Sequence, residues 1–121
     1  MADIKYTFSD LIGVDNVKPI KVIALEGQLD ESNVDEFAPK VYELLNSSDK
    51  NTNFILDVEK ITYINSKSIG YISDWYGQIV SNGGKLVIAK PASNIRDILN
   101  VVGLDKVIPM AQTIEEAKSL I

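Results

Sequence analysis

The sequence contains neither cysteine nor histidine, and these two absences restrict the chemistry that it supports. Without cysteine there is no disulfide bond, no catalytic thiolate and no zinc site built on sulfur. Without histidine the chain lacks the most frequent general base near neutral pH and the most frequent metal ligand. We therefore expect a protein that is not an enzyme and that carries no cofactor and no metal.

Long apolar runs and basic clusters are also missing. No run approaches the roughly 20 residues that a membrane-spanning helix requires. No long apolar core follows the start Met1–Lys5, as a signal peptide would need. The formal net charge of −5 argues against a nucleic-acid partner, which would require a clustered basic face. The sequence predicts a cytoplasmic protein without a nucleic-acid or membrane partner.

The remaining composition is that of one folded domain. The chain has 121 residues, of which 45% are hydrophobic. A chain of this size buries roughly two thirds of the surface that its unfolded form exposes, which is enough for one core. No linker or internal repeat divides the sequence, so we expect residues 1–121 to form a single domain.

Apolar patterning predicts strands that alternate with helices. The expected strands are Lys5–Ser9, Ile20–Leu25, Phe54–Val58, Lys85–Ala89 and a very short Val107–Ile108. The expected helix starts are a cap at Asp30, Ser32 or Asn33, a start near Ser66, a cap at Ser93 or Asn94, and a cap at Thr113. This order favours an α/β fold with a mostly parallel sheet, whose first two strands form a hairpin at one edge. Phe54–Val58 is apolar enough to be the central strand.

The most informative stretch is the corner between the third strand and the second helix. Ser66 stands at the predicted helix start, where a hydroxyl most often acts only as an N-cap. The same place is receptive to a phosphate, because the first-turn amides and the helix dipole favour negative charge. Phosphorylation would add nearly two negative charges, which the fold tolerates and a docked partner does not. Ser66 is therefore a candidate switch residue, with a plain N-cap as the alternative.

A partner-binding surface is predicted on the second helix beside Ser66. If the apolar stripe of this helix faces the sheet, its other side is exposed, and that side carries Lys67, Tyr71, Asp74, Trp75 and Gln78. An exposed tryptophan beside a tyrosine is typical of a binding hot spot. The alternative is that Trp75 packs against a neighbouring helix.

Two other chemical roles are disfavoured. Asp57 ends the predicted central strand, as the phosphoacceptor does in response-regulator receiver domains, but no acidic pair follows the strand Ile20–Leu25. We interpret Asp57 as a residue that binds neighbouring loop amides at the carboxyl edge of the sheet. Catalysis by Ser66 is also disfavoured, because no histidine is present to activate it and the Gly-x-Ser-x-Gly pattern is absent.

Several segments together resemble the STAS domain family and, within it, the bacterial anti-sigma factor antagonists. The resemblance runs over most of the chain, from about Ile20 onward. The segments are Gly27–Asp30, Phe54–Val58 with Ile61–Ile64, Asn65–Gly70, Asn82–Leu86 and Val102–Val107. Any one of them is a weak signal, but together, in order and at the family's spacing, they are specific.

This resemblance implies a STAS-like mixed, mostly parallel sheet of four to five strands with about four helices packed on one side. It also implies that Ser66 is phosphorylated by a partner that is both an anti-sigma factor and a serine kinase, and that ATP belongs to that kinase. The unphosphorylated protein would bind the anti-sigma factor and so free sigma for transcription. The partner-binding residues predicted for this role are Asp30, Asn33, Asn65, Lys67, Tyr71, Asp74 and Trp75. We expect a monomer or a weak dimer.

Two positions depart from the family motif. The acid that precedes the phosphorylated serine is Asn65 here, and the first glycine of the motif is Ser68. Asn65 lacks the negative charge of an acid beside Ser66, and Ser68 supplies a second hydroxyl, which makes it a second candidate for phosphorylation. These departures leave an alternative function open, namely a STAS scaffold or accessory subunit of another complex, stressosome-like or involved in lipid transport.

Overall fold

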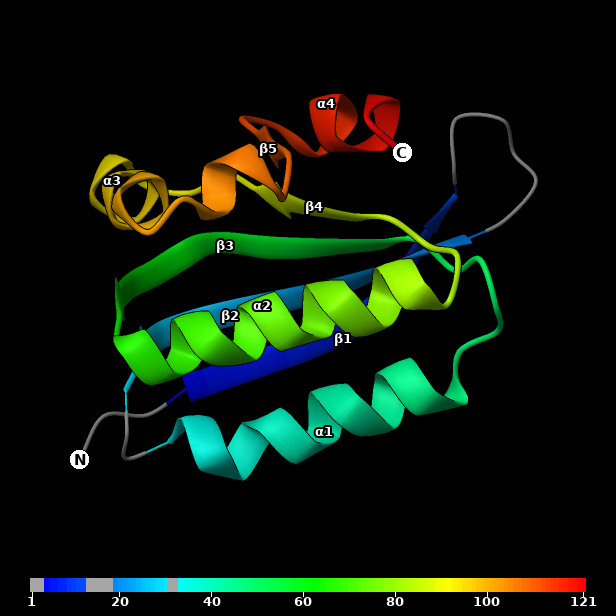
Figure 1. The fold of residues 1–121 in the computed structure, drawn as a ribbon, viewed down its shortest axis with the longest axis horizontal. Coiled ribbons are helices and arrows are strands. Elements are labelled where there is room, and N and C mark those ends of the chain that lie inside the picture. Colours follow the sequence, from blue (N-terminus) through cyan, green and yellow to red (C-terminus); the bar gives the residue numbers. More distant parts are fainter. Residues whose placement is uncertain (1–3, 13–18, 31–32) are drawn as a thin grey trace.

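The computed structural model describes residues 4–12, 19–30 and 33–121. They form one sheet of five strands in the order β1-β2-β3-β4-β5, with helices between the strands (Figure 1). The strands are β1 (Ile4–Ile12), β2 (Pro19–Leu29), β3 (Phe54–Ile64), β4 (Leu86–Ala89) and β5 (Met110–Ala111). The helices are α1 (Val34–Ser47), α2 (Ser66–Ser81), α3 (Ser93–Val101), the short 3-10 helix η1 (Leu104–Lys106) and α4 (Ile114–Ser119).

The predicted order of elements and the position of the central strand are confirmed. β1 and β2 pair as an antiparallel hairpin, and β1 forms one edge of the sheet. The pairs β2–β3, β3–β4 and β4–β5 are all parallel, and β3 lies in the middle. The α/β class with a mostly parallel sheet therefore holds.

The last strand lies later in the sequence than predicted. Gly103, with φ of 82°, follows α3, and the chain then turns through η1 instead of extending. The amide of Ile108 donates to the carbonyl of Leu104 at 2.8 Å, so this segment is used in a turn. The prediction of a strand at Val107–Ile108 is wrong, and β5 begins at Met110.

The two faces of the sheet carry separate hydrophobic clusters. Alternate residues of the strands point to opposite faces. One face packs against α1, α2 and α3, and its cluster includes Ile23, Leu56 and Ile88. The other face packs against α4 through Ala117, over the cluster that contains Ile55. The expectation of helices on one side therefore holds for α1, α2 and α3 but not for α4, whose Ala117 lies in the cluster on the opposite face.

β3 continues beyond the predicted end at Val58 and carries the chain to Ile64. Its register against β2 shifts between Ala24 and Glu26, next to Asp57. Asp57 Oδ1 accepts a hydrogen bond from the amide of Glu59 at 3.1 Å. The prediction that Asp57 binds loop amides at the end of the strand is wrong, because both residues lie inside β3.

The Asp57 carboxylate also has a cationic partner that sequence reasoning did not identify. Asp57 Oδ2 lies 3.2 Å from Lys90 Nζ, just after β4. Burial by itself would lower the pKa of Lys90, but the hydrogen bond and charge of Asp57, with the nearby charge of Glu59, raise that pKa on balance.

Within the described residues, no helix has the length and apolar character needed to cross a bilayer.

Candidate functional site

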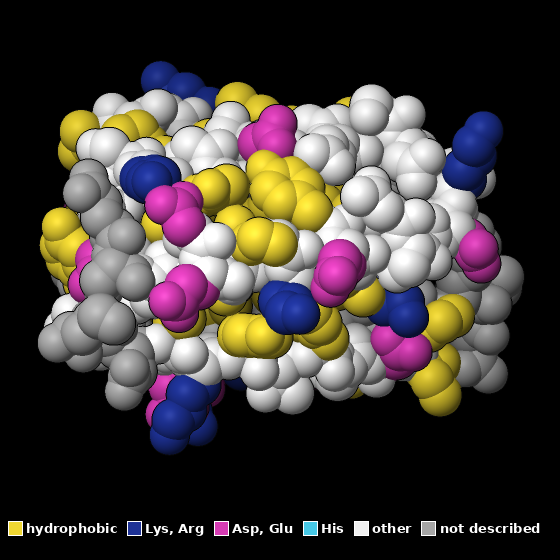
Figure 2. All heavy atoms as spheres, turned by 90° about the horizontal axis from the view of Figure 1, so that it is seen from below, with side chains coloured by type: hydrophobic (Ala, Val, Ile, Leu, Met, Phe, Trp, Pro, Cys, Tyr) yellow, Lys and Arg dark blue, Asp and Glu magenta, His cyan; other side chains and the backbone are white. Residues whose placement is uncertain are grey.

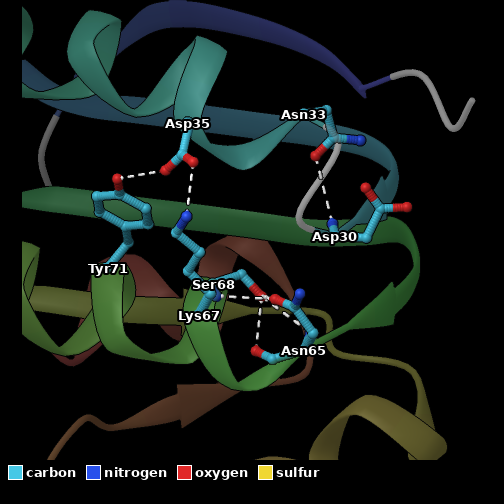
Figure 3. Close-up of polar contacts among 7 residues, drawn as sticks. All are labelled: Asp30, Asn33, Asp35, Asn65, Lys67, Ser68 and Tyr71. Carbon is cyan, nitrogen blue, oxygen red and sulfur yellow. Dashed lines mark hydrogen bonds and ion pairs between the residues drawn. The ribbon is translucent and has the colours of Figure 1, made fainter.

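The corner between β3 and α2 is closed by a reciprocal capping box. Asn65 is the N-cap of α2, and its Oδ1 accepts from the amide of Ser68 at 2.9 Å (Figure 3). In return, Ser68 Oγ accepts from the amide of Asn65 at 3.0 Å. Two of the amides that a helix start leaves without partners are thus satisfied by this pair of side chains.

The capping box accounts physically for the two departures from the family motif. Asn65 supplies the cap acceptor that an acid would supply, but without the charge. Ser68, at the third helical position, accepts a hydrogen bond from the Asn65 amide in return. Ser68 is only 1% exposed, and its hydroxyl also lies 2.8 Å from the carbonyl of Asn65. The two residues therefore act together in the helix start. Burial and these bonds argue against Ser68 as a site that a kinase reaches in the folded protein.

Ser66 is the first residue of α2 and is exposed. It is not the N-cap, because Asn65 occupies that position. Among the described residues, none forms a hydrogen bond with the Ser66 hydroxyl. Ser66 therefore lies on the surface at the positive end of a helix, and its side chain does not cap that helix.

Beside Ser66, a polar cluster joins α2 to α1. Lys67 Nζ lies 2.6 Å from Asp35 Oδ2, and the Tyr71 hydroxyl donates to Asp35 Oδ1 at 2.8 Å (Figure 3). The hydrogen bond from Lys67, followed by that from Tyr71, lowers the pKa of the Asp35 carboxyl. The hydrogen bond from Tyr71 to Asp35 also raises the pKa of the Tyr71 hydroxyl. Asp35 therefore stays ionised and holds two α2 side chains in place.

A second polar contact across the two helices lies one turn further along α2. The Tyr42 hydroxyl on α1 donates to Asp74 Oδ2, and Gln78 Nε2 donates to the same oxygen at 3.2 Å. Burial, followed by the hydrogen bond to Asp74, raises the pKa of Tyr42 to about 12. We call the surface formed by Asp35, Tyr42, Lys67, Tyr71 and Asp74 the α1–α2 seam. On the face that Figure 2 shows, apolar side chains gather near the middle, with carboxylates and lysines around them.

Trp75 lies below this seam and not on the surface. It is 1% exposed, so the expectation of an exposed binding residue is wrong. Its ring contacts Phe37 of α1 edge-on at 5.9 Å and stacks on Tyr71 at 6.2 Å between ring centroids. The alternative that Trp75 packs against a neighbouring helix is correct, since α2 is buried on two sides, against the sheet and against α1.

Asp30 and Asn33 lie in the turn between β2 and α1. Asn33 Nδ2 donates to the carbonyl of Gln28 at 2.6 Å. Figure 3 shows the second bond, in which Asn33 Oδ1 accepts from the amide of Asp30 at 3.3 Å. Asn33 occupies the N-cap position of α1 but makes no side-chain cap bond to the helix. It is only 4% exposed, so its side chain holds the turn and is covered from solvent. Ser32, the third expected cap, lies outside the described residues.

The solvent side of α2 that begins at Ser66 is built from small residues. Gly70, Ser73 and Gly77 follow Ser66 at helical spacing, and all are exposed. A Cβ atom added to Gly70 or Gly77 would meet no atom within 4 Å, so the fold itself leaves room for a side chain there. The backbone of α2 is therefore open to close approach beside Ser66.

Comparison with known proteins decides the family. The sequence matches the STAS domain over residues 12–117. This chain belongs to the STAS domain family. Within the described part of this STAS domain, no group of three or more acidic side chains is placed to hold a metal ion.

Solved structures with the same fold support this assignment. A Thermotoga maritima protein, provisionally assigned as an anti-sigma factor antagonist, is 26% identical, with a TM-score of 0.75 over 94% of this chain and 93% of its own. An anti-sigma factor antagonist from Mycobacterium paratuberculosis is 17% identical, with a TM-score of 0.77 over 98% and 94% of the two chains. The phosphorylated form of SpoIIAA, a Bacillus cell fate determinant, is 19% identical, with a TM-score of 0.68 over 96% and 98%.

Two members of the α1–α2 seam of this STAS domain were missed by sequence reasoning. Asp35 and Tyr42 bind the predicted residues Lys67, Tyr71 and Asp74 from the opposite helix. They are seven positions apart on α1, which places them on one face of that helix. The periodicity was visible in the sequence, but the pairing of α1 with α2 was not.

Proposed function

We propose that this STAS domain is an anti-sigma factor antagonist that acts by binding, without enzymatic activity, in the cytoplasm. In this proposal, its partner is an anti-sigma factor that is also a serine kinase. The unphosphorylated protein binds that partner and frees sigma for transcription, and phosphorylation of Ser66 breaks the complex. Neither nucleic acid nor a membrane is a partner in this function.

One observation carries the proposal, namely the exposed Ser66 at the first position of α2. Its hydroxyl is accessible, while Ser68, the other hydroxyl of the motif, is 1% exposed and bonded within the capping box. A kinase acting on the folded domain therefore meets one serine at this corner.

The physical effect of a phosphate at Ser66 differs between the fold and an interface. Negative charge at a helix start is favourable by about 0.3–1 kcal/mol, because the first-turn amides and the dipole attract it. A phosphate buried against a docked protein instead loses its hydration and repels nearby carboxylates. Modification at this position is thus mild for folding and severe for binding, as a switch requires.

The proposed partner surface is the α1–α2 seam together with the small-residue side of α2. The predicted residues Lys67, Tyr71 and Asp74 lie here, with Asn65 and Asp30 at the adjacent corner. The side chains of Lys67, Tyr71 and Asp74 are held by their bonds to α1, so they lose little freedom when a partner docks. Trp75 supports this surface from below through its stacking on Tyr71.

Relatives give the proposal a precedent. SpoIIAA, an anti-sigma factor antagonist, has been solved in both the phosphorylated and the unphosphorylated form. The unphosphorylated form is 21% identical to this chain, with a TM-score of 0.71. At this identity the likeness concerns the fold, and the phosphorylation switch is proposed for this chain on the exposure of Ser66.

The first experiment incubates the purified protein with the cognate kinase and ATP, and measures intact mass with site mapping. We expect one added phosphate on Ser66, no phosphate on Ser68, and no modification of the variant Ser66→Ala. Absence of phosphate on the unmodified chain would refute the switch, and equal modification of Ser68 would refute the accessibility argument.

The second experiment separates interface from fold with a matched pair of variants. Ser93 is also an exposed serine at the first position of a helix, α3, so Ser93→Asp places the same charge in the same helical context. We expect Ser66→Asp to weaken partner binding at least tenfold, about 1.4 kcal/mol, and Ser93→Asp to leave it unchanged. Both variants should keep the thermal midpoint of the parent within a few degrees. Equal effects of the two on binding would contradict the proposed surface.

A further inference from the structure

The edge strand β1 lacks most of the features that usually prevent a strand from pairing with another chain, and its two charges, Lys5 and Asp10, lie outside its central stretch. It is nine residues long, and its pairing with β2 runs without a bulge from Ile4 to Ile12. It contains no proline, and the stretch from Tyr6 to Ser9 contains no charge. Native sheets normally protect long edges with prolines, bulges, central lysines or a very short edge strand. The opposite edge, β5, is protected in this way, because it has only two residues.

The outer row of backbone groups on β1 is free in the part of the chain that the structure describes. β1 has only β2 as a neighbour in the sheet (Figure 1). Every second residue of an antiparallel edge strand directs its amide and carbonyl away from the sheet. Such a row is a template for a further strand.

We propose that β1 pairs with β1 of a second copy of this chain, antiparallel and centred on Phe8. The two sheets would then join into one continuous sheet across a two-fold axis that passes between the two Phe8 residues. The contact is isologous, so each residue pair occurs twice and the assembly closes as a dimer.

The register follows from length and from the faces of the strand. Centring on Phe8 is the only alignment that pairs all nine residues, and it places Ile4 opposite Ile12 of the second copy. Ile4 and Phe8 belong to the cluster on the α1–α2 face of the sheet, and Ile12, on the same face by alternation, is 66% exposed. The pairing would therefore cover an isoleucine that the single chain leaves in solvent.

Charge favours a second copy in this register. The whole chain has a net charge of −5, so two copies repel each other overall. β1 is an exception, since Lys5 and Asp10 balance each other within it. Centring on Phe8 places Asp10 opposite Tyr6 and Lys5 opposite Leu11, so no two like charges are directly opposed. A shift by one pair toward the amino end would set Asp10 against Ile4 and would lose two residue pairs.

The register can be read with single cysteines, because the chain has none of its own. Thr7 and Ser9 are exposed on β1, so neither replacement disturbs the core. Centring on Phe8 places Thr7 directly opposite Ser9 of the second copy, about 4.5–5.5 Å apart between Cα atoms, within disulfide reach. Like positions, Thr7 with Thr7 or Ser9 with Ser9, are then diagonal neighbours about 7–8 Å apart, beyond that reach.

The test combines sedimentation of the full chain with oxidation of two variants. We expect a concentration-dependent monomer–dimer equilibrium for the parent. A mixture of Thr7→Cys and Ser9→Cys should form a disulfide-linked dimer, and each variant alone should not. A parent that stays monomeric at every concentration overturns the proposal. Crosslinking of Thr7→Cys with itself, or of Ser9→Cys with itself, overturns the register.

A charge pair gives an independent check. Thr7→Glu with Ser9→Glu in one chain opposes carboxylates across the two-fold axis, and Thr7→Lys with Ser9→Lys opposes ammonium groups. We expect each double variant alone to be monomeric and the mixture to form a heterodimer; dimers of either double variant alone contradict the pairing. None of these residues belongs to the proposed partner surface, so failure of the dimer and failure of the Ser66 switch are separate results.

Discussion

The burial of Trp75 gives the sharpest test of how this domain divides its aromatic residues between core and surface. Trp75 is 1% exposed and contacts Phe37 and Tyr71, so Trp75→Ala removes a large buried ring and leaves a cavity. Such truncations cost about 3–5 kcal/mol. Since domains of this kind have about 5–15 kcal/mol of stability in total, the variant should be severely destabilised.

The indole N–H of Trp75 refines this expectation. It is buried, and no described residue accepts its hydrogen bond. Trp75→Phe keeps most of the ring contacts and removes this unsatisfied donor, which by itself costs about 1–3 kcal/mol when buried. The loss on Trp75→Phe should therefore be much smaller than the loss on Trp75→Ala.

Urea unfolding followed by circular dichroism measures both variants, because the signal does not depend on the tryptophan. Val101, which is 85% exposed, supplies the control, and Val101→Ala should change the free energy of unfolding by no more than about 0.5 kcal/mol. In the parent, Trp75 is the only tryptophan, so its fluorescence should be blue-shifted and protected from acrylamide. Solvent-like emission together with a neutral Trp75→Ala variant would refute the buried position.

Three further predictions concern the helix start, the seam and the glycines. Asn65→Ala and Ser68→Ala should each destabilise the protein by about 1 kcal/mol, and the double variant should lose less than the sum in urea unfolding, because each residue caps the other. Strict additivity would show that the capping box is not formed. Since the pKa of Asp35 is lowered, its stabilising effect is complete above the ordinary value of about 3.9 and is lost as the pH falls through the lowered value. The difference in thermal midpoint between the parent and Asp35→Asn, measured at a series of acidic pH values, should follow that course. Gly84→Ala should destabilise strongly, because its Cβ would lie 1.9 Å from the carbonyl oxygen of Thr52, whereas Gly70→Ala should stabilise by about 1 kcal/mol; similar midpoints for these two in urea would contradict the packing described at Gly84.

The order and type of the elements could be predicted because the apolar periodicity is strong in each segment. The apolar character of Phe54–Val58 predicts the central strand. The spacing of Thr113 to Glu116 predicts the cap at Thr113, and the Thr113 side chain does accept a hydrogen bond from the Glu116 amide. β5 could not be predicted in place, because it has two residues and no pattern of its own. Its position depends on the turn through η1, which is decided by packing.

The candidate site was predicted in part. Ser66 and the helix start were placed correctly, because cap chemistry is local in sequence. Trp75 was misplaced because a helical pattern shows which residues are apolar but not whether a second helix covers another side. Lys90 was missed for a different reason. It adopts φ of 58° directly after β4, and only the arrangement of parallel strands brings it to Asp57.

The exposed glycines of α2 have a consequence for any attempt to engineer this domain. Alanine at Gly70 and Gly77 would meet no neighbouring atom and would strengthen the helix, so a sequence optimised for folding alone would replace both. The added methyl groups would stand on the proposed partner surface beside Ser66 and would keep a docked backbone away from α2. Thermostabilisation and recognition thus compete at the same two positions, and a stabilised version of this domain that keeps its partner should gain its stability elsewhere.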